Sequence, residues 1–453
     1  MEFPALYLAD MPPEAVLDPR IVREASIAVK RNRARYLETM STSSLVSLIA
    51  SLGEECRHPT NPFRQRMLTQ GPAHTGLSPA SLASGLDRFF ESLTRDSILD
   101  LLRQDLGHER RLDEICSTPV EQRANKSSVA TGPEMIGHIT PRLLPVSALQ
   151  SMVLGLLAKS SQFFRCSPGT SLIPRVFAHA LHALDSRVGS CLEFAEWSSE
   201  QQELTDALIA ESGCVTAAGQ DETLISIRSR VPAGVRFLGF GNRLSFAFIS
   251  KDLLVPHNLG RLAGKAAADV ATWDQLGCLS PQVIYVEEGG AASPESFAEK
   301  LAQELDRVES EEPRAVLAPE VSATITRLRG LYEIRASAGT GTQLWKSENS
   351  TAWTVIFEQD PQFQKSCLHR FIYVKGVRSV DDMLQAADVV RGQVSTVGLA
   401  VHDGDAPEIV YRLARWGVSR VCPLGRMQQP PAAWRHDGRL GLAELVQWTD
   451  WEH

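Results

Sequence analysis

The stretch that decides the fold is residues 161–185, SQFFRCSPGTSLIPRVFAHALHALD, which joins a short apolar run, a turn and a helix pattern. Residues 162–166 predict a buried strand, and Ser167-Pro168-Gly169 predicts the turn that follows it. In residues 173–185 the apolar positions recur at three- and four-residue intervals, as on one face of a helix. A strand followed by a turn and a helix is half of a βαβ unit, the element from which parallel sheets are built.

The same alternation continues on both sides of this stretch. Strands are expected near 135, 190–194 and 214–218, and helices at 147–159, 199–211 and 222–231. A second series of strands and helices runs from the apolar run 281–287 to the helix pattern 406–416. The sequence therefore predicts an α/β protein with two domains, each built around a mostly parallel sheet, and ligands at the carboxyl ends of the strands.

Four segments follow from this pattern. Residues 1–125 show helical periodicity, including a long run from Leu77 to Leu106, and are expected to pack on the first domain. Residues 126–250 form that domain, which is Rossmann-like, and residues 251–420 form the second. The last segment, 421–453, is expected to return to the first domain or to form an oligomer interface. The polar residues 119–132 predict a loop.

The composition excludes several classes of protein. The chain has 453 residues, of which 43% are hydrophobic and 22% charged, as in ordinary globular enzymes. Its net charge of -8 argues against nucleic acid, because phosphate binding needs a surplus of Lys and Arg. The longest apolar helix pattern, Val146 to Ala158, is too short to span a bilayer, and no secretory signal begins the chain. We therefore expect a cytoplasmic protein without a membrane span.

The cysteines point to one candidate nucleophile. Eight cysteines are scattered along the chain without the spacing of a zinc site, so no metal is expected. Cys278 differs from the others because it follows Gly277, a helix-ending residue, and precedes the apolar strand 281–287. A thiol at such a junction is placed to attack a ligand, and a thiolate is both a strong nucleophile and a good leaving group.

The segment around this cysteine, Asp274-Gln275-Leu276-Gly277-Cys278-Leu279-Ser280-Pro281, resembles the active-site segment of acyl-CoA reductases of the LuxC type. Five further blocks resemble that family in the same order: 145–159, 217–222, 239–246, 368–371 and 421–427. The resemblance covers roughly residues 130–453. It implies the aldehyde-dehydrogenase superfold, with a Rossmann-type cofactor domain, a catalytic domain and oligomerising extensions.

In that family the cysteine accepts the acyl group of a thioester, so the resemblance implies this role for Cys278. Asp274 is a candidate for orienting the cysteine, or it simply caps or anchors the helix before it. The acyl donor would be an acyl-CoA or an acyl-carrier protein, and the product an aldehyde. Aldehyde-oxidising members of the superfold carry a glutamate that activates water, whereas the corresponding residues 239–243 contain no acidic side chain. This absence favours reduction of a thioester over oxidation of an aldehyde.

The resemblance also implies NADPH as the hydride donor and suggests where it binds. Arg165 and Ser167 occupy the place of the Lys-Pro-Ser end of a strand, and Arg165 would reach the ribose or its 2′-phosphate. Gly219 and Gln220 resemble a Gly-Ser turn before a helix, where backbone N–H groups meet pyrophosphate. Gly241 lies in the next turn. The residues do not decide between NADPH and NADH, and Arg165 is read equally well as a surface arginine.

One position departs from the superfold. An asparagine that binds the oxyanion is expected two residues before Pro145, where this chain has Leu143, a side chain without a donor. Either His138 or Arg142 substitutes for it, or backbone donors suffice, or catalysis is slow. His369 is tempting as an acid or base, although a lone histidine is more often structural.

Three alternatives stay open. The alternatives to thioester reduction are a CoA-acylating aldehyde dehydrogenase, an acyl-phosphate reductase of the same fold, and a scaffold subunit with impaired catalysis. An acyl-transferring partner enzyme and a homo-oligomer are both compatible with the resemblance. Acyl chain length and carrier are not encoded in any residue pattern that we identify.

Overall fold

The computed structural model describes residues 4–12, 14–141 and 144–453, which form two compact units. Unit 1 contains the described residues up to Thr75, then Leu86–Gly241 and Pro431–His453. Unit 2 contains Gly76–Gly85 and Asn242–Pro430. The boundary expected at residue 250 thus lies at Gly241, because β7 (Leu244–Ile249) is a central strand of the second sheet rather than part of the first.

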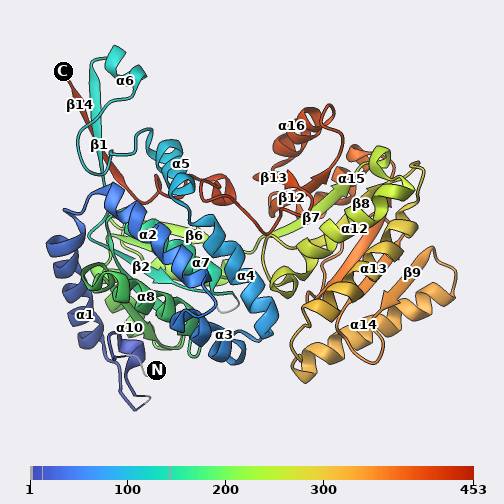
Figure 1. Ribbon diagram of the computed structural model, residues 1–453, viewed down its shortest axis with the longest axis horizontal. Coiled ribbons are helices and arrows are strands. Elements are labelled where there is room, and N and C mark those ends of the chain that lie inside the picture. Colours follow the sequence, from blue (N-terminus) through green and yellow to red (C-terminus); the bar gives the residue numbers. More distant parts are fainter. Residues whose placement is uncertain (1–3, 13, 142–143) are drawn as a thin grey trace. The chain divides into compact units, whose positions relative to one another are not determined.

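Unit 1 is built around a five-stranded parallel sheet (Figure 1). Its strand order is β4 (Leu192–Glu196), β3 (Ser161–Cys166), β2 (Met135–Ile139), β5 (Cys214–Ala218) and β6 (Arg236–Phe240). Alternate residues of β3 face opposite sides: Phe163 packs with α1 (Pro19–Asn32) and α10 (Gln202–Glu211), whereas Gln162 bonds to α7 (Val146–Leu157). Helices therefore cover both faces, as a doubly wound sheet requires.

Further helices of unit 1 surround this sheet. They are α2 (Thr42–Arg57), α3 (Pro62–Thr75), α5 (Arg95–Leu106), α8 (Leu172–Leu184), α9 (Ser186–Gly189) and α11 (Asp221–Arg230), with a π-helical turn at Arg33–Leu37. The helical run expected over 77–106 is broken into α4 (Pro79–Ser92) and α5, because Thr94 caps α5 by accepting from the N–H of Ser97. The first 125 residues are thus mainly helical, as expected.

The prediction of a loop over residues 119–132 was wrong. This segment contains a short helix, α6 (Pro119–Arg123), and the strand β1 (Lys126–Thr131), which pairs antiparallel with β14 (Gln447–Glu452) near the end of the chain. The polar residues of β1 misled the prediction because this two-stranded ribbon has little apolar surface to bury. Residues 431–453 lie in unit 1, whereas 421–430 remain in unit 2.

Unit 2 contains a seven-stranded sheet in the order β13-β12-β7-β8-β11-β10-β9, parallel except for the edge strand β9. The strands not yet given are β8 (Pro281–Glu287), β9 (Thr342–Lys346), β10 (Thr354–Glu358), β11 (Phe371–Val377), β12 (Val394–Ala400) and β13 (Arg420–Pro423). One core cluster joins the sheet to α12 (Pro256–Ala271) and α13 (Pro294–Glu311). Another joins it to α14 (Pro319–Ser337), α15 (Val380–Ala386) and α16 (Ala406–Trp416). Short 3-10 turns lie at Leu8–Asp10, Lys251–Leu253, Thr272–Gln275, Asp388–Val390 and His436–Gly438.

Candidate active site and nucleotide-binding edge

Cys278 lies in the turn that leads into β8, and its side chain is exposed. The other seven cysteines are buried or partly buried. Burial raises the pKa of Cys56, Cys166, Cys191 and Cys214 to about 12, which keeps these thiols protonated and unreactive. Exposure therefore distinguishes Cys278 from the other cysteines.

The chain does not reach Cys278 in the way that the sequence predicts. Gly277 was expected to end a helix, but α12 already ends at Ala271. The reversal occurs at Trp273, Asp274 and Gln275, three consecutive residues with φ of 56°, 50° and 65°. Non-glycine residues rarely adopt this left-handed conformation, so the residue types gave no signal for it.

Side chains from distant segments hold the turn that follows. Gln275 donates from Nε2 to the carbonyl of Pro281 at 2.8 Å and accepts at Oε1 from the N–H of Phe371 at 2.9 Å. The carbonyl of Cys278 accepts from the hydroxyl of Ser245 at 2.7 Å, and Ser280 is bonded to Gln428 at 2.8 Å. The backbone on both sides of the thiol is thus fixed while the thiol itself stays exposed.

Asp274, the predicted orienting residue, is only 2% exposed. Its carboxylate oxygen Oδ1 lies 2.8 Å from Nη2 and 3.0 Å from Nε of Arg370, and it also accepts from the hydroxyl of Ser81 at 3.1 Å. These contacts occupy the carboxylate with neighbouring protein groups. The geometry is that of a structural ion pair one turn before the cysteine.

His369 belongs to the segment that carries Arg370. Leu368, His369 and Arg370 form a second left-handed triplet, with φ of 66°, 59° and 63°. The ring nitrogen Nδ1 of His369 is buried without a hydrogen bond in the described part of the chain. Burial and the nearby Arg314 lower the pKa of His369, which keeps the ring neutral.

The five residues predicted to bind a cofactor lie together at one edge of the unit 1 sheet. Arg165 is near the end of β3 and Ser167 follows that strand, Gly219 and Gln220 join β5 to α11, and Gly241 follows β6. All are at the carboxyl ends of parallel strands, where open α/β sheets bind their ligands. The sheet therefore brings together residues that are up to 76 positions apart in the sequence, from Arg165 to Gly241.

Arg165 is the chemically distinctive residue of this edge. Its side chain is 7% exposed, and no partner in the described residues bonds to its Nε or forms an ion pair with it. Burial lowers the pKa of its guanidinium. A buried cation without a counter-charge is costly, so the surface-arginine interpretation of Arg165 is wrong.

Sequence reasoning missed an acidic side chain beside Gly241. The stretch 239–243 contains no acid, but a Cβ atom at Gly241 would lie 2.4 Å from Oδ1 of Asp221 at the start of α11. Asp221 begins the helix after β5 and Gly241 follows β6, and only the neighbouring parallel order of β5 and β6 shows that these segments meet. A side chain at position 241 would therefore have to displace the Asp221 carboxylate.

A cavity of about 80 Å³ lies in unit 1 next to this edge. Its mostly apolar lining comes from α7, from the ends of β2, β5 and β6, and from residues 432–445 near the end of the chain. Phe240 stacks on His436, with ring centres 4.7 Å apart. The guanidinium of Arg439, which belongs to the same segment as His436, lies 4.7 Å from the centre of the Phe240 ring. The last segment was expected to return to this domain or to form an oligomer interface, and its lining residues were not identified from the sequence.

The suggestion that His138 donates to an oxyanion was wrong. Its Nε2 donates to Oε1 of Gln162 at 3.0 Å, its Nδ1 accepts from the hydroxyl of Thr216 at 2.7 Å, and the residue is 2% exposed. Burial lowers the pKa of the ring to about 3, so it stays neutral and engaged within the sheet. The other positions of that argument, Arg142 and Leu143, lie outside the described residues.

The described residues contain neither a metal-binding cluster nor a helix that could span a membrane. No group of three or more His, Cys, Asp or Glu side chains there is arranged to hold a metal ion. Within the same residues, every helix is too short or too polar to cross a lipid bilayer.

Solved structures of aldehyde dehydrogenases resemble the chain over nearly its whole length. A glyceraldehyde-3-phosphate dehydrogenase GapN of Methanocaldococcus jannaschii complexed with NADP matches with a TM-score of 0.67 at 10% identity, covering 96% of this chain and 94% of the other. An NAD-dependent benzaldehyde dehydrogenase of Corynebacterium glutamicum matches with a TM-score of 0.64 at 13% identity, covering 96% and 91%. Proline utilization A of Bradyrhizobium japonicum matches with a TM-score of 0.69 at 15% identity, but this chain spans only 45% of that larger protein. These likenesses confirm the aldehyde-dehydrogenase-like fold.

A search of the curated proteins found no match to the sequence. The family model for acyl-CoA reductase (LuxC), in contrast, matches residues 37–448, which is most of the chain. The predicted family is thereby confirmed: the protein belongs to the LuxC family of acyl-CoA reductases.

Proposed function

We propose that the protein reduces an acyl thioester to an aldehyde with NADPH, through an acyl group held on Cys278. The observation that carries this proposal is the exposed thiol of Cys278 in a turn whose two ends are fixed by Gln275, within a chain of the acyl-CoA reductase family. Asp274 is proposed as a residue that orients this turn, since its carboxylate is occupied by Arg370 and Ser81.

The chemistry begins at the Cys278 sulfur. Its thiolate attacks the carbonyl carbon of the acyl thioester and forms a new C–S bond, while the C–S bond to the carrier breaks. The carrier leaves as a thiolate with the displaced electron pair and takes a proton from water. The backbone fixed by Ser245 and Gln275 holds the sulfur and the neighbouring N–H groups in one geometry while the acyl group is exchanged. When bound, the dinucleotide supplies the hydride that the acyl group needs to become an aldehyde. The release of the aldehyde returns the thiolate to Cys278.

The edge formed by Arg165, Ser167, Gly219, Gln220 and Gly241 fits an anionic nucleotide. The evidence is the buried guanidinium of Arg165, whose Nε lacks a partner in the described residues and would be matched by a phosphate oxygen. Gln220 precedes α11 without a side-chain cap hydrogen bond in the described residues, and a helix N-terminus favours a phosphate. The structurally similar GapN complexed with NADP and the NAD-dependent benzaldehyde dehydrogenase support a nicotinamide cofactor. The choice of NADPH rests on the family resemblance and on the Arg165 guanidinium.

Partners and location follow from the same proposal. The acyl donor would be an acyl-CoA or an acyl-carrier protein, and an acyl-transferring enzyme would deliver it. We propose a cytoplasmic homo-oligomer. The unit around the first sheet is proposed as the cofactor domain, and the unit that carries Cys278 as the catalytic domain.

Acyl trapping tests the proposal. The wild type and the variants Cys278→Ala and Cys422→Ala are mixed with acyl-CoA carrying a labelled acyl group, without NADPH. We expect one equivalent of label on the wild type and on Cys422→Ala, and none on Cys278→Ala. Labelling that survives in Cys278→Ala would exclude this cysteine as the nucleophile. Absence of label from acyl-CoA together with labelling from an acyl phosphate would favour the acyl-phosphate alternative.

A further inference from the structure

The two left-handed triplets of unit 2, Trp273–Gln275 and Leu368–Arg370, are unfavourable on their own. Each non-glycine residue in this conformation costs about 1–2 kcal/mol. The two triplets together contain six such residues. Such a conformation persists only where surrounding contacts over-determine it. The contacts that do so here connect the two triplets to each other.

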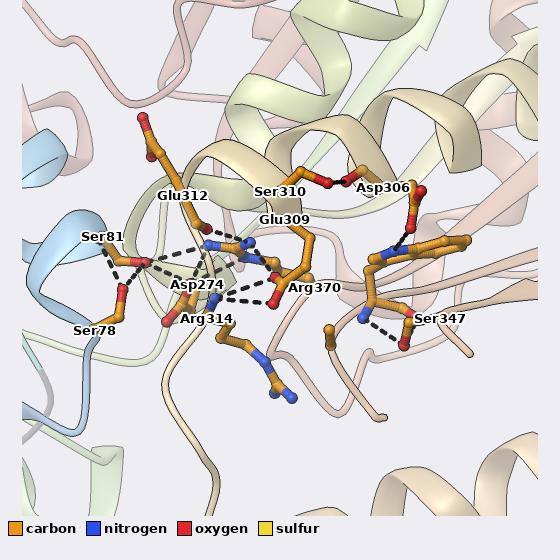
Figure 2. Close-up of polar contacts among 12 residues, drawn as sticks. Ser78, Ser81, Asp274, Asp306, Glu309, Ser310, Glu312, Arg314, Ser347 and Arg370 are labelled. Carbon is orange, nitrogen blue, oxygen red and sulfur yellow. Dashed lines mark hydrogen bonds and ion pairs between the residues drawn. The ribbon is translucent and has the colours of Figure 1, made fainter. Parts of the chain in front are cut away.

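Arg370 is at the centre of these contacts (Figure 2). We call Ser81, Asp274, Glu309, Glu312 and Arg370 the Arg370 cluster. Figure 2 shows the guanidinium between the carboxylates of Asp274 and Glu309, with Ser81 beside Asp274. Arg370 itself is 0% exposed.

An arginine has five N–H donors, and the guanidinium of Arg370 makes four hydrogen bonds and two ion pairs. Nε and Nη2 lie 3.0 and 2.8 Å from Oδ1 of Asp274, Nη1 donates to Oε2 of Glu309 at 2.9 Å and to the carbonyl of Glu312 at 3.0 Å, and Nη2 reaches the hydroxyl of Ser81 at 3.2 Å. A charge buried in this way is compensated fully, so the cluster holds its geometry rather than awaiting a ligand.

A second bond beside the cluster carries this geometry to Cys278. Phe371, the residue after Arg370, donates its N–H to Gln275, the residue after Asp274, at 2.9 Å. Gln275 in turn donates to Pro281 on the far side of the Cys278 turn at 2.8 Å. The backbone that enters the turn and the backbone that leaves it are therefore tied to the Leu368–Arg370 triplet.

We propose that Arg370 is a positioning residue for Cys278: by fixing Asp274 it sets the left-handed triplet from which the nucleophile's turn begins. Arg370 acts through Asp274 and Gln275 and does not touch the substrate. The inference rests on the proposed role of Cys278 as nucleophile. Because displacement of a reacting atom by about 1 Å costs roughly a hundredfold in rate, loosening this cluster slows acyl transfer without removing the thiol.

The experiment compares Arg370→Lys, Arg370→Met and Ser81→Ala with a matched control. Lys375→Met is the control, because Lys375 is also buried in unit 2, is 1% exposed and forms an ion pair with Glu358, and no bond joins it to residues 273–281 within the described chain. For each protein we measure three quantities: the single-turnover rate of Cys278 acylation at saturating acyl-CoA, the rate of alkylation by iodoacetamide, and hydrogen–deuterium exchange of the peptide 273–281.

We expect Arg370→Met to slow acylation by about a hundredfold, Arg370→Lys by about tenfold and Ser81→Ala by about threefold. Alkylation by iodoacetamide, which needs only an accessible thiolate, should change by less than about threefold. Exchange of peptide 273–281 should rise in the Arg370 variants but not in Lys375→Met. A purely structural role would instead move acylation and alkylation together, in proportion to the loss of stability.

Acylation of the Arg370 variants at the rate of Lys375→Met, with unchanged exchange of 273–281, would overturn the inference. If Arg370→Met does not fold, Arg370→Lys and Ser81→Ala decide the question by the same measurements. If the wild type is not acylated at Cys278, the proposed function fails. The exchange measurement then still tests whether Arg370 fixes this turn.

Discussion

Two buried arginines, one in each unit, are in opposite electrostatic situations. Arg370 in unit 2 is 0% exposed and contacts two carboxylates, a carbonyl and a hydroxyl, whereas Arg165 in unit 1 is 7% exposed and has no counter-charge in the described residues. Burial of a charge costs several kcal/mol unless partners compensate it. A compensated arginine therefore stabilises its surroundings, and an uncompensated one lowers stability in a way that a bound anion would offset.

The largest expected effect concerns stability. Arg370→Met leaves the buried carboxylate of Asp274 and the partly buried carboxylate of Glu309 without their cation, and we expect it to destabilise the protein by about 3–5 kcal/mol. Arg165→Met removes an unpaired charge, so we expect a change within about 1 kcal/mol or a gain in stability. Urea unfolding followed by fluorescence and circular dichroism measures both. Similar losses in the two variants would break the comparison.

The next effect concerns binding by Arg165. Because its Nε has no hydrogen-bond partner in the described residues, its guanidinium is proposed to pair with a phosphate of NADPH, and hydrogen bonds to charged groups contribute about 1.5–3 kcal/mol. We expect Arg165→Gln to raise the Kd for NADPH by about tenfold to a hundredfold, and that for NADH by less than about threefold. Titration of cofactor fluorescence measures both constants, with the exposed Arg228→Gln as control. Equal weakening for the two cofactors would place Arg165 away from the 2′-phosphate.

The smallest effect concerns Glu193 on β4, a partly buried carboxyl that accepts from the N–H groups of Leu8 at 2.8 Å and Phe194 at 2.9 Å. It forms no ion pair in the described residues, and burial raises its pKa from 4.5 to about 7. Between these values the unfolded chain releases this proton and the folded chain retains it. The free energy of unfolding therefore falls as pH rises from 4.5 to about 7.

Glu193→Gln keeps the accepting oxygen and removes the titration. Relative to the wild type, we expect this variant to gain about 1–2 kcal/mol between pH 4.5 and pH 7, after allowance for partial exposure. Unfolding curves across this pH range give the difference directly. A difference in unfolding free energy that stays constant with pH would contradict the raised pKa of Glu193. The carboxyl would then be less desolvated than its burial indicates.

Much of the fold was predictable because it is encoded in local periodicity. Apolar runs such as 281–287 and helix patterns such as 406–416 repeat at the spacing of strands and helices, and the structure has β8 and α16 over those same residues. The ribbon strand β1 and the boundary at Gly241 were not predictable in this way. Polar strands such as β1 lack the apolar signal. Local periodicity shows that β7 is a strand, but only the fold shows which of the two sheets it joins.

By itself, the sequence determined the α/β class, the acyl-CoA reductase family and the distinctive context of Cys278. Only the tertiary structure decided that Arg165 is buried without a counter-charge among the described residues, that Asp221 lies against Gly241, and that Arg370 reaches Asp274. Ser81, Asp274 and Arg370 are separated by 193 and 96 residues, and no local pattern encodes contacts over such distances. The left-handed triplets were equally hidden, because their residue types prefer other conformations and adopt this one only when such contacts compensate for it.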